Sequence, residues 1–175
     1  MTSKESEKLH KLCVWACSYS RAEVLLENCP LVFQGGGRVS GTEWFKVLGE
    51  WWVSCDNIGA YRTIFRSILR KASQAQLQAM MNDEERAKWK QLPDKIQAWR
   101  GCEANDRTGL SFSLSQETAR RFPFLRRYLA ELPSLITATI PRKSAVLKLE
   151  RGEEEVITAF AAITQQEYLN EQPTQ

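Results

Sequence analysis

The residues best suited to chemistry lie in the C-terminal half of the sequence, where three adjacent glutamates, Glu153, Glu154 and Glu155, run into Val156 and Ile157. The β-branched pair predicts that a strand begins here. In an extended chain, Glu153 and Glu155 point to the same side. Two carboxyls that close resist ionising together, a pattern found at functional sites, although an acidic turn before a strand would have the same sequence.

A second candidate is an arginine inside a predicted strand. Residues 96–102 alternate as a half-buried strand does, and Arg100 follows Ile96 and Ala98 on the same side. Its planar guanidinium can hold a phosphate through two parallel hydrogen bonds. Gly101 has no Cβ and would let a ligand approach the backbone. Alternatively, Arg100 pairs with a carboxylate across the sheet.

A third candidate is the pair of hydroxyls in Ser111-Phe112-Ser113. Side chains two apart share one face of a strand, so Ser111 and Ser113 face one side and Phe112 the other. Such hydroxyls can hold a catalytic carboxylate and a ribose, although serines are also common on the solvent face of an edge strand. A helix is predicted directly afterwards, over 116–122, with Ser115 as its N-cap.

The periodicity of the sequence changes near Pro93, and this change separates predicted helices from predicted strands. Before it, helical spacing predicts helices over 9–16, 42–52 and 60–69. The apolar face of the first is expected to carry Leu9, Leu12, Cys13, Trp15 and Ala16. A polar helix from about Ser73 and a short helix over 82–89, capped by Asn82 or Asp83, are also predicted. After it, short strands are predicted over 96–102, 110–114, 135–140, 145–149 and 156–160.

These elements predict an α+β fold in which a helical N-terminal half precedes a small mixed or antiparallel β-sheet core. We expect a helical region over 1–92, a β core over 93–165 and a flexible polar tail over 166–175. The helical region is expected to pack on the core, so that the chain forms one compact domain.

Composition narrows the class of protein. The formal net charge of +3 is too small to indicate a nucleic-acid partner by itself, and the basic residues from Arg120 to Lys143 suit either a phosphate-facing surface or a solvated helix face. His10 is the only histidine, which excludes a Ser-His-Asp triad and an HExxH metal site. Five scattered cysteines without a CxxC pair predict reduced thiols and no metal. With neither a signal peptide nor a long apolar segment, we expect a cytoplasmic protein without a membrane partner.

Taken in order, the motifs resemble those of a known family. Trp99-Arg100-Gly101, then Ser111-Phe112-Ser113 with a helix that carries Ala119 and Phe122, then Glu153-x-Glu155-Val-Ile, is similar to the Arg–Ser–Glu class of ADP-ribosyltransferases. That class includes clostridial-type toxins, vertebrate arginine-specific enzymes and small phage enzymes. The resemblance covers residues 96–160. Ser-Phe-Ser replaces the usual Ser-Thr-Ser, and Pro123 is expected to shorten the helix beside the cleft.

The resemblance implies an NAD cleft in the β core and a role for each motif residue. Glu155 would be the catalytic carboxylate, Glu153 would position and deprotonate the acceptor, and Ser111 would brace Glu155. Arg100 would contact the NAD phosphates and the nicotinamide-side ribose, with Gly101, Ser113 and Phe122 completing the NAD site. NAD would be a substrate, and no metal is implied.

The function that follows from the resemblance is mono-ADP-ribosyl transfer from NAD to a protein acceptor, with release of nicotinamide. A glutamate at position 153 is the family feature that accompanies arginine acceptors, so the expected target is an arginine side chain of another protein, inside a bacterium or a host cell. The alternatives are transfer to nucleic acid, hydrolysis of NAD, or an inactive member of the fold that acts by binding a partner.

Overall fold

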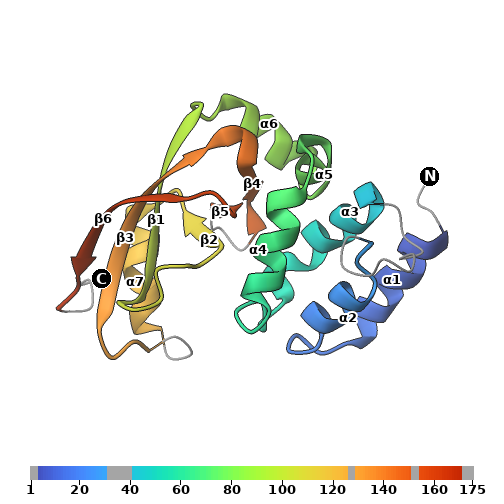
Figure 1. The fold of residues 1–175 in the computed structure, drawn as a ribbon, viewed down its shortest axis with the longest axis horizontal. Coiled ribbons are helices and arrows are strands. Elements are labelled where there is room, and N and C mark those ends of the chain that lie inside the picture. Colours follow the sequence, from blue (N-terminus) through green and yellow to red (C-terminus); the bar gives the residue numbers. More distant parts are fainter. Residues whose placement is uncertain (1–3, 31–40, 126–128, 151–153, 171–175) are drawn as a thin grey trace. The chain divides into compact units, whose positions relative to one another are not determined.

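A computed structural model of the chain describes residues 4–30, 41–125, 129–150 and 154–170. The chain divides into two compact units, Met1–Arg86 and Ala87–Gln175. The sequence predicted one compact domain in which helices are followed by strands from about Pro93. The division falls inside helix α6 (Asp83–Gln91). Along the chain, helices come first and strands follow, in the order that the sequence predicted (Figure 1).

The first unit is helical. It contains α1 (Lys4–Trp15), α2 (Arg21–Glu27), α3 (Gly41–Trp51), a 3-10 turn (Trp52–Ser54), α4 (Arg62–Lys71), α5 (Gln74–Ala79) and the start of α6. The helices predicted from apolar spacing are therefore confirmed. Their fully buried side chains form the core of the unit: Leu9, Leu25, Trp44, Phe45, Leu48 and Phe65.

Helix α1 uses a narrower apolar face than the sequence suggested. Its buried residues are Ser6, Leu9 and Cys13, which are three and four positions apart and so form one stripe. Leu12 and Trp15, which the sequence assigned to the same face, lie outside that stripe. The exposed fraction of Trp15 is 89%.

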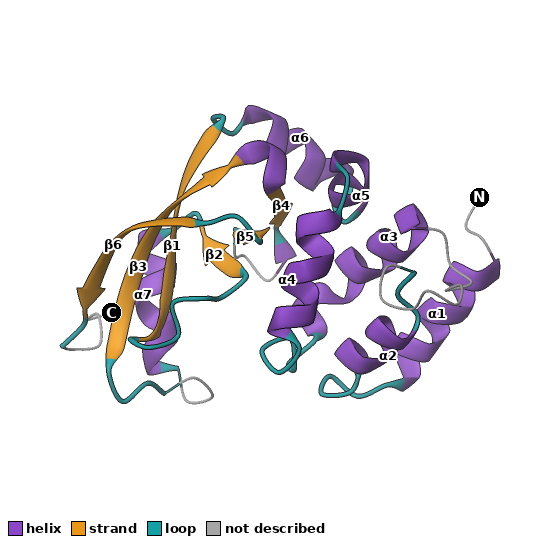
Figure 2. Ribbon diagram, in the orientation of Figure 1, coloured by secondary structure: helices purple, strands orange, loops and turns teal. Residues whose placement is uncertain are grey.

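The second unit is built on a six-stranded sheet (Figure 2). Its elements are β1 (Lys95–Glu103), β2 (Ser111–Ser113), α7 (Gln116–Arg121), a 3-10 turn (Phe122–Phe124), β3 (Pro133–Pro141), a 3-10 turn (Arg142–Ser144), β4 (Ala145–Lys148), β5 (Glu155–Thr158) and β6 (Ala162–Tyr168). The strand order is β4-β5-β2-β1-β3-β6, and every described pair is antiparallel. The α+β class is thereby confirmed.

Strand β6 corrects the prediction of a polar tail. Residues 166–168 belong to this strand, which pairs with β3 as an edge of the sheet, and Leu169 beyond it is buried. The strand was missed because an edge strand can be polar on both faces, and a polar run without alternation resembles a tail.

Helix α7 packs on β1 and begins as predicted. The Ser115 hydroxyl accepts a hydrogen bond from Thr118 N at 3.1 Å, which caps the helix. The helix ends at Arg121, one residue earlier than its sequence prediction, because Pro123 lies in the 3-10 turn that follows. Pro123 therefore shortens the helix, as expected.

Candidate functional site

The three candidate segments lie on neighbouring strands. In the order β5-β2-β1, Ser113 of β2 is directly opposite Glu155 of β5 on one side and Trp99 of β1 on the other. Directly opposed residues of an antiparallel sheet emerge on the same face. Glu155, Ser113 and Trp99 therefore form one row across the sheet, although they are far apart in the sequence.

A buried lysine extends this row. Lys148 of β4 is opposite Glu155, and only 3% of it is exposed. Its Nζ lies 3.6 Å from Glu150 Oε1. Sequence reasoning missed Lys148, since a lysine at the end of a short apolar strand normally reaches solvent. A positive charge thus lies on the strand next to the candidate catalytic carboxylate.

Arg100 leaves β1 on the other face from Trp99, because side chains alternate along a strand. Trp99 and Ser113 are the paired residues of β1 and β2 in the sheet. The Arg100 side chain adds a second connection between these strands, because its Nη1 donates a hydrogen bond to the Ser111 backbone oxygen at 3.1 Å. The alternation therefore separates the Arg100 side chain from the row that contains Glu155. The structure brings the three motifs onto adjacent strands and leaves Arg100 on the opposite face.

The Arg100 guanidinium has a second partner in the connection between β1 and β2. Nη2 lies 3.3 Å from Asp106 Oδ2, so Arg100 does have a carboxylate partner, from this connection. Its Nε is buried and makes no hydrogen bond. Burial raises the pKa of the nearby Cys102 thiol, and the positive charge of Arg100 opposes that rise. Sequence reasoning missed Asp106, although an acidic residue in so short a connection was the available signal.

Gly101 and Gly109 lie where neighbouring atoms leave no room for a side chain. A Cβ on Gly101 would lie 1.9 Å from Ala119 O and 2.6 Å from Pro123 Cδ, so Gly101 lets α7 approach β1. This replaces the role expected from the sequence, approach of a ligand to the backbone. A Cβ on Gly109 would lie 2.1 Å from Arg100 Cζ, so Gly109 makes room for the guanidinium.

The two serines have different surroundings. Ser113 is 8% exposed, and its hydroxyl accepts a hydrogen bond from Ser115 N at 3.0 Å, which supports the turn into α7. Ser111 is opposite Ile157, so Ser113 and not Ser111 is the serine directly beside Glu155. Phe122 begins the 3-10 turn after α7 and is half-buried.

Of the three adjacent glutamates, the structure describes Glu154 and Glu155. Glu155 is half-buried at the start of β5. Glu154 forms an ion pair with Lys88, and its backbone oxygen accepts from Leu114 N at 2.9 Å. Glu153 lies outside the described residues, so the predicted side-by-side arrangement of Glu153 and Glu155 stays a prediction.

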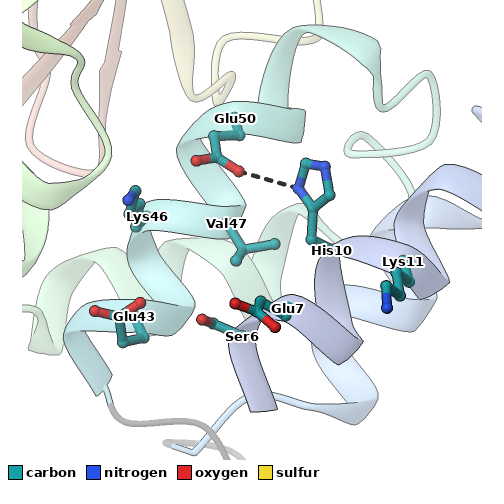
Figure 3. Close-up of a pocket in the computed structure, with 8 residues that line it drawn as sticks. All are labelled: Ser6, Glu7, His10, Lys11, Glu43, Lys46, Val47 and Glu50. Atoms are coloured by element: carbon teal, nitrogen blue, oxygen red, sulfur yellow. Dashed lines mark hydrogen bonds and ion pairs between the residues drawn. The ribbon is translucent and has the colours of Figure 1, made fainter. Parts of the chain in front are cut away.

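A cavity of about 320 Å³ lies in the first unit, and none of the candidate site residues described above lines it (Figure 3). Residues of α1 and α3 line it: Ser6, Glu7, His10, Lys11, Glu43, Lys46, Val47 and Glu50. His10 Nδ1 is 3.1 Å from Glu50 Oε2 and 3.2 Å from Trp51 Nε1. A protonated Nδ1 suits the carboxylate and a bare Nδ1 suits the indole N–H, so the ring serves one partner at a time.

The described residues contain no group of three or more histidine, cysteine, aspartate or glutamate side chains arranged to hold a metal ion. Nor is any helix in the described ranges both long and apolar enough to cross a membrane. Comparison with protein family models, curated proteins and solved structures finds no match to this chain.

Proposed function

We propose that this protein is a mono-ADP-ribosyltransferase that moves ADP-ribose from NAD to a protein, with an arginine side chain as the acceptor. The observation that carries the proposal is the row Trp99–Ser113–Glu155. Three motifs that resemble the Arg–Ser–Glu class, on separate parts of the sequence, belong to the adjacent strands β1, β2 and β5. This adjacency is what the proposal needs, because the residues of one site must come from neighbouring strands.

In the proposed reaction, Glu155 stabilises positive charge on the ribose. When the bond to nicotinamide breaks, the ribose becomes oxocarbenium-like, and a fixed carboxylate near its hydroxyls offsets that charge. Ser113, opposite Glu155 in the sheet, supports the strand that carries the carboxylate. Nicotinamide leaves as a neutral molecule from a cationic one, so the step needs no general acid. Glu153 would then position and deprotonate the incoming guanidinium.

Arg100 is proposed to bind the phosphates of NAD. Its guanidinium is fixed by Ser111 O at 3.1 Å, and its buried Nε still lacks an acceptor. An unsatisfied buried donor on a cation suits an anionic oxygen. Arg100 leaves β1 on the face opposite to Trp99, and β1 and β2 are inner strands of the sheet. The dinucleotide would therefore have to pass the ends of these strands to reach both Arg100 and Glu155.

The test is nicotinamide release and transfer from labelled NAD in a bacterial lysate, with the wild type and two variants. Glu155→Gln keeps the size of the side chain and removes its charge, and nicotinamide release should fall by about 100-fold or more. Glu154→Gln makes the same change one residue away, on the residue paired with Lys88, and should leave the rate within about twofold.

Labelled protein bands that vanish in Glu155→Gln, with mass spectrometry locating ADP-ribose on arginine, would support the full proposal. Release of nicotinamide without labelled protein would redirect it to NAD hydrolysis or to a nucleic-acid acceptor. If NAD neither bound nor reacted, the proposal would be wrong, and a binding function of the fold would take its place.

A further inference from the structure

The guanidinium of Arg100 presents one half-occupied edge. Of its donors, Nη1 is taken by the Ser111 backbone oxygen. Nε and Nη2 form the edge that can bind two oxygens of one anion side by side. On that edge, Nη2 reaches a single oxygen of Asp106 at 3.3 Å, and the buried Nε makes no hydrogen bond. The edge is therefore matched to a two-oxygen anion that the described residues do not supply.

Asp106 is poorly suited to be the permanent partner of this edge. A carboxylate that paired fully would place one oxygen on each donor at a distance below 3 Å, as two-pronged arginine–carboxylate pairs do. Asp106 reaches Arg100 Nη2 with one oxygen, at 3.3 Å, and its side chain is 36% exposed. This contact is longer than those of a two-pronged pair, so phosphate oxygens that engage both donors of the edge can compete with it.

Two features keep the guanidinium in place when the carboxylate leaves. Gly109 lies against the guanidinium, where a Cβ would come within 2.1 Å of Cζ. Ser111 O holds Nη1 from the neighbouring strand. Removal of Asp106 from the edge would thus leave an arginine that is still oriented and has two free donors on one side.

We infer that Asp106 occupies the anion-binding edge of Arg100 in the ligand-free protein, and that the pyrophosphate of a dinucleotide binds by displacing it. The inference rests on the proposed role of Arg100 in NAD binding and adds a residue that sets the affinity. Asp106 competes with the substrate's phosphate oxygens for Nη2. The loop between β1 and β2 therefore tunes how tightly the site takes up anions.

The experiment is calorimetric titration of the full-length protein with inorganic pyrophosphate and with ADP-ribose. Asp106→Asn removes the competing charge and keeps the shape of the side chain. It should tighten pyrophosphate binding about fivefold, the range expected from loss of a partly exposed ion pair. Arg100→Lys, which cannot bind two oxygens side by side, should weaken binding of both probes about tenfold.

The matched control is Asp94→Asn. Asp94 also pairs with an arginine of the second unit, Arg142, at 2.6 Å, and its substitution changes the net charge by the same amount. It should leave pyrophosphate affinity unchanged. Equal tightening by Asp94→Asn and Asp106→Asn would mean a general charge effect and would overturn the inference.

Other outcomes separate this inference from the proposed function. If the wild type binds pyrophosphate, Arg100→Lys weakens binding and Asp106→Asn changes nothing, the inference is wrong while the use of Arg100 in NAD binding stands. If no variant binds either probe, the inference is also wrong. Nicotinamide release by the wild type then decides the proposed function independently.

Discussion

Gly109 lies against the end of the Arg100 side chain, so close that a Cβ on residue 109 would be 2.1 Å from Arg100 Cζ and 2.2 Å from Nε. The contact joins the connection between β1 and β2 to the guanidinium. It explains why a glycine stands at the point where this connection returns to the sheet. The same contact makes the orientation of Arg100 sensitive to one methyl group.

Gly109→Ala should therefore displace the guanidinium more than it destabilises the fold. The atoms that a Cβ would meet belong to the end of a flexible side chain, which can move away. We expect pyrophosphate affinity to fall about tenfold, as in Arg100→Lys, with a loss of unfolding free energy below about 1 kcal/mol. Titration calorimetry and urea unfolding measure the two effects. Unchanged anion binding would show that the position of Arg100 is unimportant.

Gly101→Ala should have the opposite profile. Here the Cβ would meet a backbone oxygen, Ala119 O, at 1.9 Å, and α7 as a whole would have to move from β1. Overpacking of this kind costs about 1–3 kcal/mol, which urea unfolding followed by far-UV circular dichroism would detect. Gly59→Ala is the control, since its Cβ would meet nothing within 4 Å. Equal stability of the two variants would contradict the close approach of α7.

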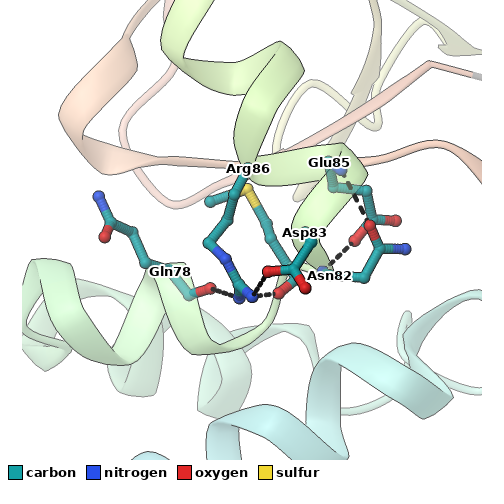
Figure 4. A network of polar contacts seen from close by, with 6 residues as sticks. Gln78, Asn82, Asp83, Glu85 and Arg86 are labelled. Atoms are coloured by element: carbon teal, nitrogen blue, oxygen red, sulfur yellow. Dashed lines mark hydrogen bonds and ion pairs between the residues drawn. The ribbon is translucent and has the colours of Figure 1, made fainter.

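The start of α6 is held by a reciprocal pair of hydrogen bonds (Figure 4). Asn82 Oδ1 accepts from Glu85 N at 2.9 Å, and the buried Glu85 carboxylate accepts from Asn82 N at 2.8 Å. Of the two caps that the sequence allowed, Asn82 is the one observed. Arg86 adds contacts to Gln78 O at 3.2 Å and to the Asp83 carboxylate at 2.6 Å.

Asn82→Ala should lower the unfolding free energy by about 1 kcal/mol, because it removes the acceptor for Glu85 N. Asn82→Ser retains a capping oxygen and should recover most of that loss. Thermal and urea unfolding of both variants provide the comparison. A serine variant as unstable as the alanine variant would mean that the side-chain oxygen is not what stabilises the helix start.

The cysteines should differ in reactivity. The exposed Cys17 Sγ lies 3.3 Å from Ser20 Oγ, and hydrogen bonding to Ser20 lowers the pKa of the Cys17 thiol. Burial raises the pKa of Cys13 from 9.0 to about 11 and that of Cys55 from 9.0 to about 12. At pH 8, a thiol reagent should modify Cys17 first and leave Cys13 and Cys55 unmodified until the protein unfolds. Peptide mapping identifies the site, and early labelling of Cys13 would contradict the buried position.

The same shifts predict an alkaline loss of stability. Between pH 9 and about 11, the unfolded chain loses the Cys13 and Cys55 protons while the folded protein keeps them. The folded state then binds more protons, so the unfolding free energy falls as the pH rises. The contribution is fully present below pH 9. Urea midpoints measured from pH 8 to pH 11 should fall less in a Cys13→Ala variant than in the wild type.

Local patterns were sufficient for most of the elements. Alternation over 96–102 and the β-branched run after Glu155 correspond to β1 and β5, and Ser115 caps α7 as its position predicted. These signals survive because they depend on near neighbours in the chain. The sequence did not predict strand β6 or which side of α1 is exposed. Both depend on contacts with distant segments, β3 and the other helices, which the spacing of residues along the chain does not reveal.

In the candidate site, too, some features follow from the sequence and others only from the tertiary structure. By itself, the sequence determined the α+β class and pointed to Arg100, Ser111, Ser113 and Glu155 through residue type and spacing. Only the tertiary structure decided that Ser113 is the serine beside Glu155, and that Arg100 is held by Asp106, Gly109 and Ser111. The physical reason is that strand order and register arise from packing between distant segments, whereas propensity and periodicity act over a few residues.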